Sequence, residues 1–200
     1  MVEIITGLVL ASAAGLNAYI PMLGLGLLSR FTDLVQLPDS WAWLENGWAL
    51  GVLGVLLALE VLVDKFPALD SVNDILQTAV RPAAGGIVFS AGSSSGTVAV
   101  ADPADFIASG SVWPFVFGVV VALVPHLLKA IARPIINTLT AGAGAAVMST
   151  LEDLGAVALT VLAVIVPLVA LALVILATIL LVRRLRRALA ARREMSNAGP

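Results

Sequence analysis

Long uncharged apolar stretches recur along the whole chain and form the strongest pattern in the sequence. A helix needs about 20 mostly apolar residues to cross a bilayer, and six segments approach that length. We therefore expect six membrane-spanning helices. The predicted spans are Ile4–Ser29, Asn46–Phe66, Pro82–Ala101, Phe106–Pro125, Pro134–Leu151 and Leu154–Val182.

Three of these spans carry local irregularities. The third, Pro82–Ala101, is polar in its second half, and the fifth, Pro134–Leu151, consists largely of small residues. For both, a short or re-entrant course is the alternative to a full crossing, because irregular backbone is tolerated at membrane depth when protein covers it. The first span contains Gly15, Asn17 and Pro21, and we expect its helix to be broken there.

The composition agrees with an integral membrane protein. Hydrophobic residues make up 60% of the chain and charged residues 12%, against about 25% charged residues in an average soluble domain. The expected fold is thus an all-α polytopic bundle, with one transmembrane domain at 1–182 and a basic cytoplasmic tail at 183–200. The absence of cysteine excludes disulfides and thiolate sites, and a single histidine excludes a multi-histidine metal site. We expect no cofactor.

The basic residues predict the orientation. Six of the eleven lie between Arg183 and Arg193, and clusters of Lys and Arg remain in the cytoplasm. With six spans, both termini are then cytoplasmic, loops 30–47 and 102–111 lie outside, and Arg30 alone among the basic residues is external. The tail is suited to anionic lipid, and small-residue faces predict a homo-oligomer. No basic face interleaved with aromatic residues points to nucleic acid.

Two acidic pairs are the first candidates for chemistry. Glu60 and Asp64 are four residues apart in a predicted span, so they share one helix face, and Asp70 and Asp74 repeat the spacing. Burial of like charges favours a bound proton, a bound cation or basic partners. One interpretation is a cation or proton site near the inner face. The other is a structural salt-bridge layer with Lys65, Arg81, Lys129 and Arg133.

A polar stripe is the second candidate. His126, Lys129, Arg133 and Asn137 are spaced by three, four and four residues, which places them on one side of a helix. The stripe either lines a pathway or an anion site, or it faces the acidic pairs.

The remaining candidates lie near the two ends of the transmembrane domain. Glu152 and Asp153 begin the last predicted span, where acids complement the helix dipole, and cation access is the alternative role. Asn17 lies at the break of the first span. Such a break frees backbone groups that can coordinate an ion or a substrate, and a proline kink is the alternative.

Three stretches carry a resemblance to a known family. They are Ala13–Pro21, then Glu60–Asp74 continuing to Arg81 and Pro82, and finally His126–Arg133 with Asn137 and Ser149–Asp153. Together they resemble the bacterial membrane proteins numbered 4126 in the domain-of-unknown-function series. The resemblance implies a polytopic fold in the bacterial cytoplasmic (inner) membrane and implies no reaction.

Three functions remain open at this stage. The first is a transporter or channel for an ion or small polar solute, with a cation or proton-coupled substrate favoured because acids outnumber bases before the tail. The second is inner-leaflet handling of a phosphate-bearing lipid, and the third is a non-transporting scaffold or accessory role. We do not expect an enzyme, because His126 has no evident nucleophile and acid partners in the sequence.

Overall fold

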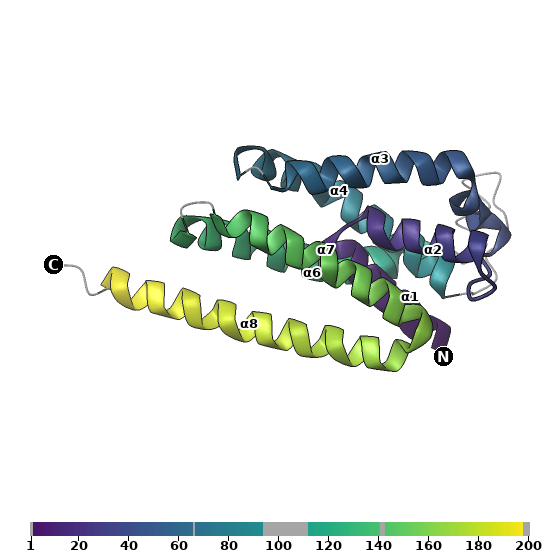
Figure 1. Cartoon of the computed structure of the whole chain (residues 1–200). Helices are drawn as coiled ribbons and strands as arrows, with labels where there is room; N and C mark the ends of the chain where they lie inside the picture. Colours follow the sequence, from purple (N-terminus) through teal and green to yellow (C-terminus); the bar gives the residue numbers. More distant parts are fainter. Residues whose placement is uncertain (1, 66, 94–111, 141–142, 198–200) are drawn as a thin grey trace.

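The computed structural model describes residues 2–65, 67–93, 112–140 and 143–197, and every regular element in them is helical. Their bounds are α1 Val2–Leu16, α2 Tyr19–Phe31, the 3-10 helix η1 Asp39–Glu45, α3 Gly47–Val63, α4 Pro67–Gly92, α6 Val112–Thr140, α7 Ala143–Ile165 and α8 Pro167–Asn197. The elements form a bundle in which α3, α6, α7 and α8 run along roughly the same direction (Figure 1).

The predicted break of the first span is present, but it turns the chain back on itself. Thr6 of α1 donates a hydrogen bond to the carbonyl of Ala163 near the end of α7, and Asn17 reaches Asp153 further back along α7. Gly24 of α2 then lies against Thr160. The segment Ile4–Ser29 is therefore a hairpin of two short helices and not one crossing, which corrects the prediction. We call this segment, α1 and α2, the helical hairpin.

The side chain of Asn17 explains the turn. Its Oδ1 accepts from the backbone N–H groups of Tyr19 and Ile20 at 3.0 and 3.2 Å, so it caps the start of α2. A helix start leaves such N–H groups without intrahelical partners, and asparagine is a preferred cap. Because α1 has 15 residues and α2 has 13, each is shorter than the roughly 20 residues that a full crossing needs.

The prolines that were expected to begin the third and fifth spans, Pro82 and Pro134, do not turn the chain. Pro82 lies inside α4, and Pro134 lies inside α6 together with Pro125. The predicted fifth span, Pro134–Leu151, is thus wrong, because its first part ends α6 and its last part begins α7. The predicted sixth span is divided instead at Pro167, the first residue of α8. Proline suits a first helical turn, and membrane helices also tolerate it internally when neighbouring groups satisfy the freed carbonyl.

The described helices are those of a membrane protein, although six spans are not confirmed. By length and apolarity three of them can cross a membrane, namely α6, the α7 residues 146–165 and the α8 residues 167–184, and η1 with α3 adds a fourth, bent by 63°. Helix α8 continues without a break past residue 182, the predicted end of the transmembrane domain. The predicted outer loop 102–111 lies outside the described residues.

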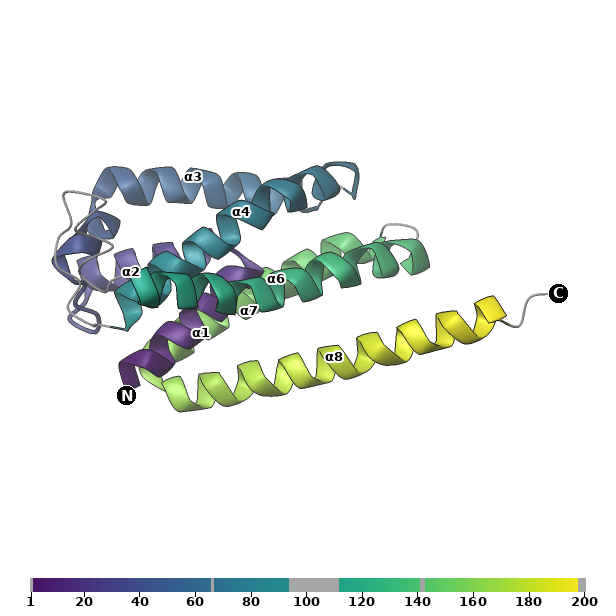
Figure 2. The ribbon, with the colours of Figure 1, turned by 180° about the vertical axis from the view of Figure 1, so that it is seen from behind.

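The two described ends of the chain lie at opposite ends of the bundle in both views (Figures 1 and 2). The helical hairpin is the reason, since it begins and ends at the same end of the bundle. The hairpin itself is central, and α1 packs against α4, α6 and α7. Close packing there depends on small residues, because a side chain on Gly15 would collide with Ala122 and Pro125 of α6.

Candidate functional site

Six buried charged side chains from four parts of the bundle form one contiguous network. Glu60 lies in the last turn of α3 and Asp64 follows directly after that helix, while Glu152 lies on α7. The three cations come from α4 and α6. The network, which we call the charge cluster, consists of Glu60, Asp64, Arg81, Lys129, Arg133 and Glu152.

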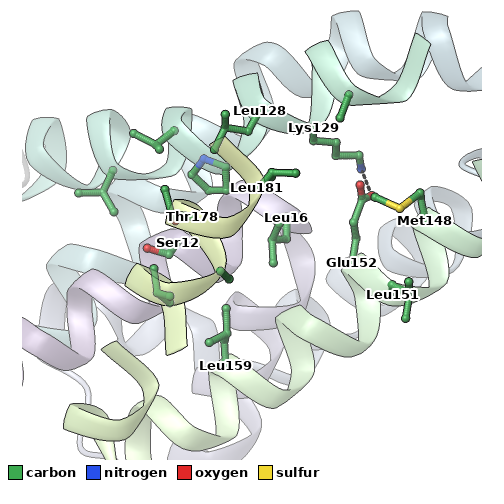
Figure 3. A pocket seen from close by; sticks show the side chains of 16 residues that line it. Ser12, Leu16, Leu128, Lys129, Met148, Leu151, Glu152, Leu159, Thr178 and Leu181 are labelled. Carbon is green, nitrogen blue, oxygen red and sulfur yellow. Dashed lines mark ion pairs between the residues drawn. The ribbon is translucent and has the colours of Figure 1, made fainter. Parts of the chain in front are cut away.

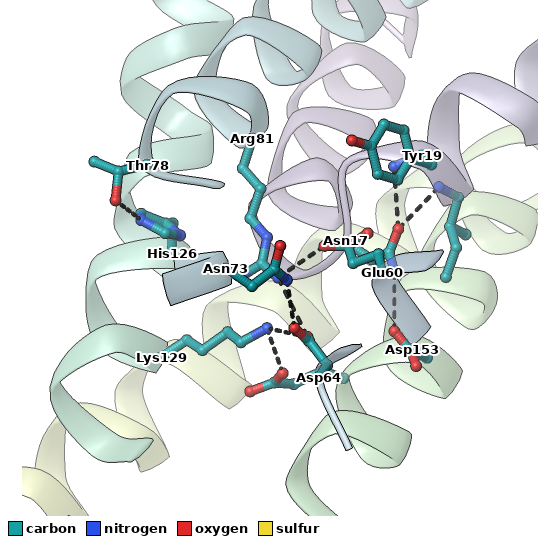
Figure 4. A network of polar contacts seen from close by, with 12 residues as sticks. Asn17, Tyr19, Glu60, Asp64, Asn73, Thr78, Arg81, His126, Lys129 and Asp153 are labelled. Carbon is teal, nitrogen blue, oxygen red and sulfur yellow. Dashed lines mark hydrogen bonds and ion pairs between the residues drawn. The ribbon is translucent and has the colours of Figure 1, made fainter. Parts of the chain in front are cut away.

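Asp64 is the centre of the charge cluster (Figure 4). Its Oδ2 lies 3.2 Å from Lys129 Nζ, 3.0 Å from Arg133 Nη2 and 3.6 Å from Arg81 Nη2. Its other oxygen, Oδ1, accepts a hydrogen bond of 2.7 Å from Asn73. One carboxylate thus links three cations that approach from two helices, and it fixes the end of α3 against them.

The other two carboxylates, Glu60 and Glu152, balance the remaining positive charge of the cluster. Arg81 Nη2 donates to Glu60 Oε1 at 2.8 Å, and Glu152 Oε2 lies 2.7 Å from Lys129 Nζ and 3.0 Å from Arg133 Nη2. Three negative charges therefore face three positive ones. Burying an ion without a partner costs several kcal/mol, so this pairing is what permits Arg81, fully excluded from solvent, to lie inside the bundle. The predicted pairing of the acidic pair with basic residues is confirmed for Glu60 and Asp64.

The helical hairpin reaches the charge cluster at its tip. Asn17 Nδ2 donates to Asp153 Oδ1 at 2.9 Å, and Asp153 directly follows Glu152 in the sequence. Asp153 is half-buried, and among the described residues its partner is this amide, with no basic group within ion-pair distance. It is thus the one acidic group beside the cluster that has no ion pair in the described structure.

Other predicted site residues lie beside the charge cluster or apart from it. His126 Nε2 is 3.1 Å from Thr78 Oγ1, and its Nδ1 has no hydrogen-bond partner among the described groups. Lys65 donates to the carbonyl of Val61 at the end of its own helix. Asn137 is partly buried and joins none of the ion pairs. Asp70 and Asp74 lie on α4, and their side chains are outside what the structure describes.

Sequence reasoning missed a polar stripe on α4. Asn73, Gln77 and Arg81 are each four residues apart, and Gln77 and Arg81 are buried. The spacing of one helix face was visible in the sequence, but residues 67–81 lay between the predicted second and third spans. Treating that stretch as the first half of a helix would have identified Asn73 as a partner for the acidic pair.

The site contains buried polar atoms that the described residues leave without hydrogen bonds. They are Glu60 Oε2 and Arg81 Nε and Nη1 in the charge cluster, with His126 Nδ1 close by. Most buried polar groups in proteins have partners, so these atoms favour contact with water or a ligand. No group of three or more His, Asp or Glu side chains in the described ranges is arranged to hold a metal ion.

Comparison with known proteins identifies a family and no activity. The family model described as a domain of unknown function, DUF4126, matches residues 4–187, which is nearly the whole chain. The chain therefore belongs to that family, and the resemblance noted from its motifs is confirmed. No curated protein and no solved structure matches it.

Proposed function

We propose that this member of the DUF4126 family is a membrane transport protein for an ion or small polar solute, with proton or cation coupling. The observation that carries the proposal is the contact between Asn17 and Asp153 at 2.9 Å, beside the buried charge cluster. Discontinuous helices whose ends meet polar groups in the middle of a bundle are a recurring way to build transport sites.

Asp153 is the group to which we assign the coupling role. Its hydrogen bond comes from an amide, so it can take up or release a proton or a monovalent cation without breaking an ion pair. The C-terminal end of α1 supports cation binding, since the last carbonyls of a helix carry partial negative charge. Ionisable groups in membrane segments are otherwise rare and mark pathways of ions or protons.

The charge cluster supplies a rearrangement that transport needs. Lys129 Nζ and Arg133 Nη2 each contact both Asp64 and Glu152. Either cation can leave one carboxylate and keep the other, so charge pairs can exchange between α3 and α7 without exposing a lone buried charge. A cluster in which each cation contacted only one carboxylate could not exchange partners in this way.

We also propose an orientation with the C-terminal end in the cytoplasm. That end of the bundle carries Lys65 at the turn after α3 and the exposed arginines of α8, and the opposite end carries Arg30 as its one described basic residue. Lys and Arg are retained on the cytoplasmic side. Because the helical hairpin starts and ends at the Arg30 end, the N-terminus then lies outside, in a bacterial cytoplasmic membrane.

Flux through reconstituted protein tests the proposal. The purified chain in proteoliposomes with an internal pH-sensitive dye is expected to carry protons when a membrane potential and a panel of inorganic and organic cations are applied. Asp153→Asn is expected to abolish coupled flux and to fold normally, because asparagine can still accept from Asn17. The matched control, Asp33→Asn, changes an exposed carboxylate and is expected to leave flux unchanged.

Two results would overturn the proposal. Wild-type flux no greater than that of protein-free liposomes for protons and every cation tested would leave the lipid-handling and scaffold roles. Equal flux from Asp153→Asn and the wild type would remove the coupling role of this carboxylate.

A further inference from the structure

A cavity of about 380 Å³ lies between α1, α6, α7 and α8, next to the charge cluster. Its volume falls at the small end of the range of about 300–1,000 Å³ for ligand sites. The wall is mostly aliphatic and includes Leu128, Leu159 and Val174. Two further lining residues, Val124 and Leu151, are also exposed on the outer face of the bundle. The cavity therefore opens toward the lipid-facing surface.

One end of the cavity is charged (Figure 3). Lys129 and Glu152 line it, with Nζ and Oε2 2.7 Å apart. Glu152 is the more accessible of the two, with 8% of its side chain exposed against 3% for Lys129. Both bonds to Glu152 end on Oε2, and no described residue donates to Oε1. The polar atom offered to an occupant is thus a carboxylate oxygen.

We infer that this cavity binds a single-chain amphiphile with a cationic ammonium head, with the head on Glu152 and the chain along the aliphatic wall. The inference rests on the proposed transport function and names the substrate class of the same site. Glu152 can accept the ammonium group because Lys129 keeps Asp64 as its partner. Arg133 keeps Asp64 in the same way. Asp153, which has no ion pair in the described structure, brings the carboxylates beside the site to four against four cations once the ammonium group is bound.

The same geometry disfavours a phosphodiester head at Glu152 Oε1. A phosphodiester head would bring anionic oxygens against the carboxylate of Glu152, and like charges at contact distance repel. The polar lining beyond the ion pair is limited to Ser12 and Thr178, and the hydroxyl of Ser12 already donates to Leu8 of its own helix.

Equilibrium binding to the full chain in lipid nanodiscs tests the inference. The probe is radiolabelled decylammonium, with decanoate, decanol and decyl phosphate as competitors, and empty nanodiscs give the background. Saturable binding of the cation is expected, without competition by decanoate. Glu152→Gln is expected to weaken binding about tenfold or more, about 1.4 kcal/mol, because the ammonium group then donates to a neutral amide oxygen in place of a carboxylate.

A pair of alanines on α8 provides a test that leaves every charge in place. Ala177 lines the cavity and Ala172 does not, and both are exposed. Ala177→Phe is expected to abolish saturable binding by filling the cavity, whereas Ala172→Phe is expected to bind like the wild type. Unchanged binding by Ala177→Phe would refute the inference even if Glu152→Gln did not fold.

The competitors separate this inference from its rivals. Equal binding of decanoate would mean that Lys129 determines the site, and equal competition by decyl phosphate would mean that an anionic phosphate head fits. Either result overturns the cationic substrate class. The binding assay does not depend on flux, so the two proposals can fail separately. Binding of the cation without transport would contradict the proposed function only. Flux of another solute without binding of the cation would contradict this inference only.

Discussion

Neutralising the central carboxylate of the charge cluster is the sharpest test of how the bundle is held together. Asp64→Asn preserves the shape of the side chain and removes the one negative charge that three cations share, at 3.0 Å from Arg133, 3.2 Å from Lys129 and 3.6 Å from Arg81. The cluster would then hold two carboxylates against three cations. One buried positive charge would lack compensation.

The expected loss of stability follows from that imbalance. Removing one partner of a buried ion pair costs about 3–5 kcal/mol. We expect the lower part of this range for Asp64→Asn, because Arg81 keeps Glu60 and both Lys129 and Arg133 keep Glu152. The double change Asp64→Asn with Lys129→Met restores neutrality and leaves two separate pairs, Glu60 with Arg81 and Glu152 with Arg133. It is expected to recover most of the loss.

Reversible unfolding in mixed detergent micelles measures the free energy of unfolding of each variant. Asp33→Asn, a change of an exposed carboxylate, serves as the control and is expected to stay within about 0.5 kcal/mol of the wild type. The reasoning is refuted if Asp64→Asn matches this control, or if the double variant is less stable than Asp64→Asn, since a shared central charge predicts neither.

Three further predictions follow from the helical hairpin. Gly15→Ala should lower stability by about 1–3 kcal/mol, as overpacking does, because its new methyl group would collide with α6. Gly51→Ala places its methyl group in open space and should not lower stability. Thermal melts of both variants check this. Asn17→Ala should lose about 0.5–2 kcal/mol with the helix cap, and Asn17→Ser, which can still cap, should lose less in the same melts. Because the chain has no cysteine, cysteines placed at Val2 and Arg187 should react with impermeant reagents from opposite sides of the membrane; labelling of both from one side would contradict the proposed orientation.

Local pattern was sufficient for much of the fold. Apolar stretches of membrane length predicted a helical membrane protein, and the break at Asn17 and the start of α3 near Asn46 were both read correctly. The capping side chain explains this success, since Asn46 accepts from Trp48 N–H at 2.9 Å within its own turn. Such interactions join residues that are neighbours in sequence, so the sequence alone determines them.

The errors arose where distant segments decide the local structure. Arg81-Pro82 and Arg133-Pro134 were expected to begin new spans, yet both continue long helices. In water a proline inside a helix costs about 3 kcal/mol, and this favours a turn. In a packed bundle the freed carbonyl can find other partners and the flanking arginines are held by carboxylates of α3 and α7, so the helix persists.

The sequence by itself placed Glu60 and Asp64 inside an apolar span, whereas Lys129 and Glu152 fell between predicted spans. It could not determine which charged side chains form ion pairs with one another. Lys129 and Asp64 are 65 residues apart in the chain, and their contact exists because α3, α6 and α7 pack around the helical hairpin. Coulomb attraction falls off with distance and strengthens with desolvation, so only the tertiary structure, which sets both, decides that six buried charges form one neutral cluster.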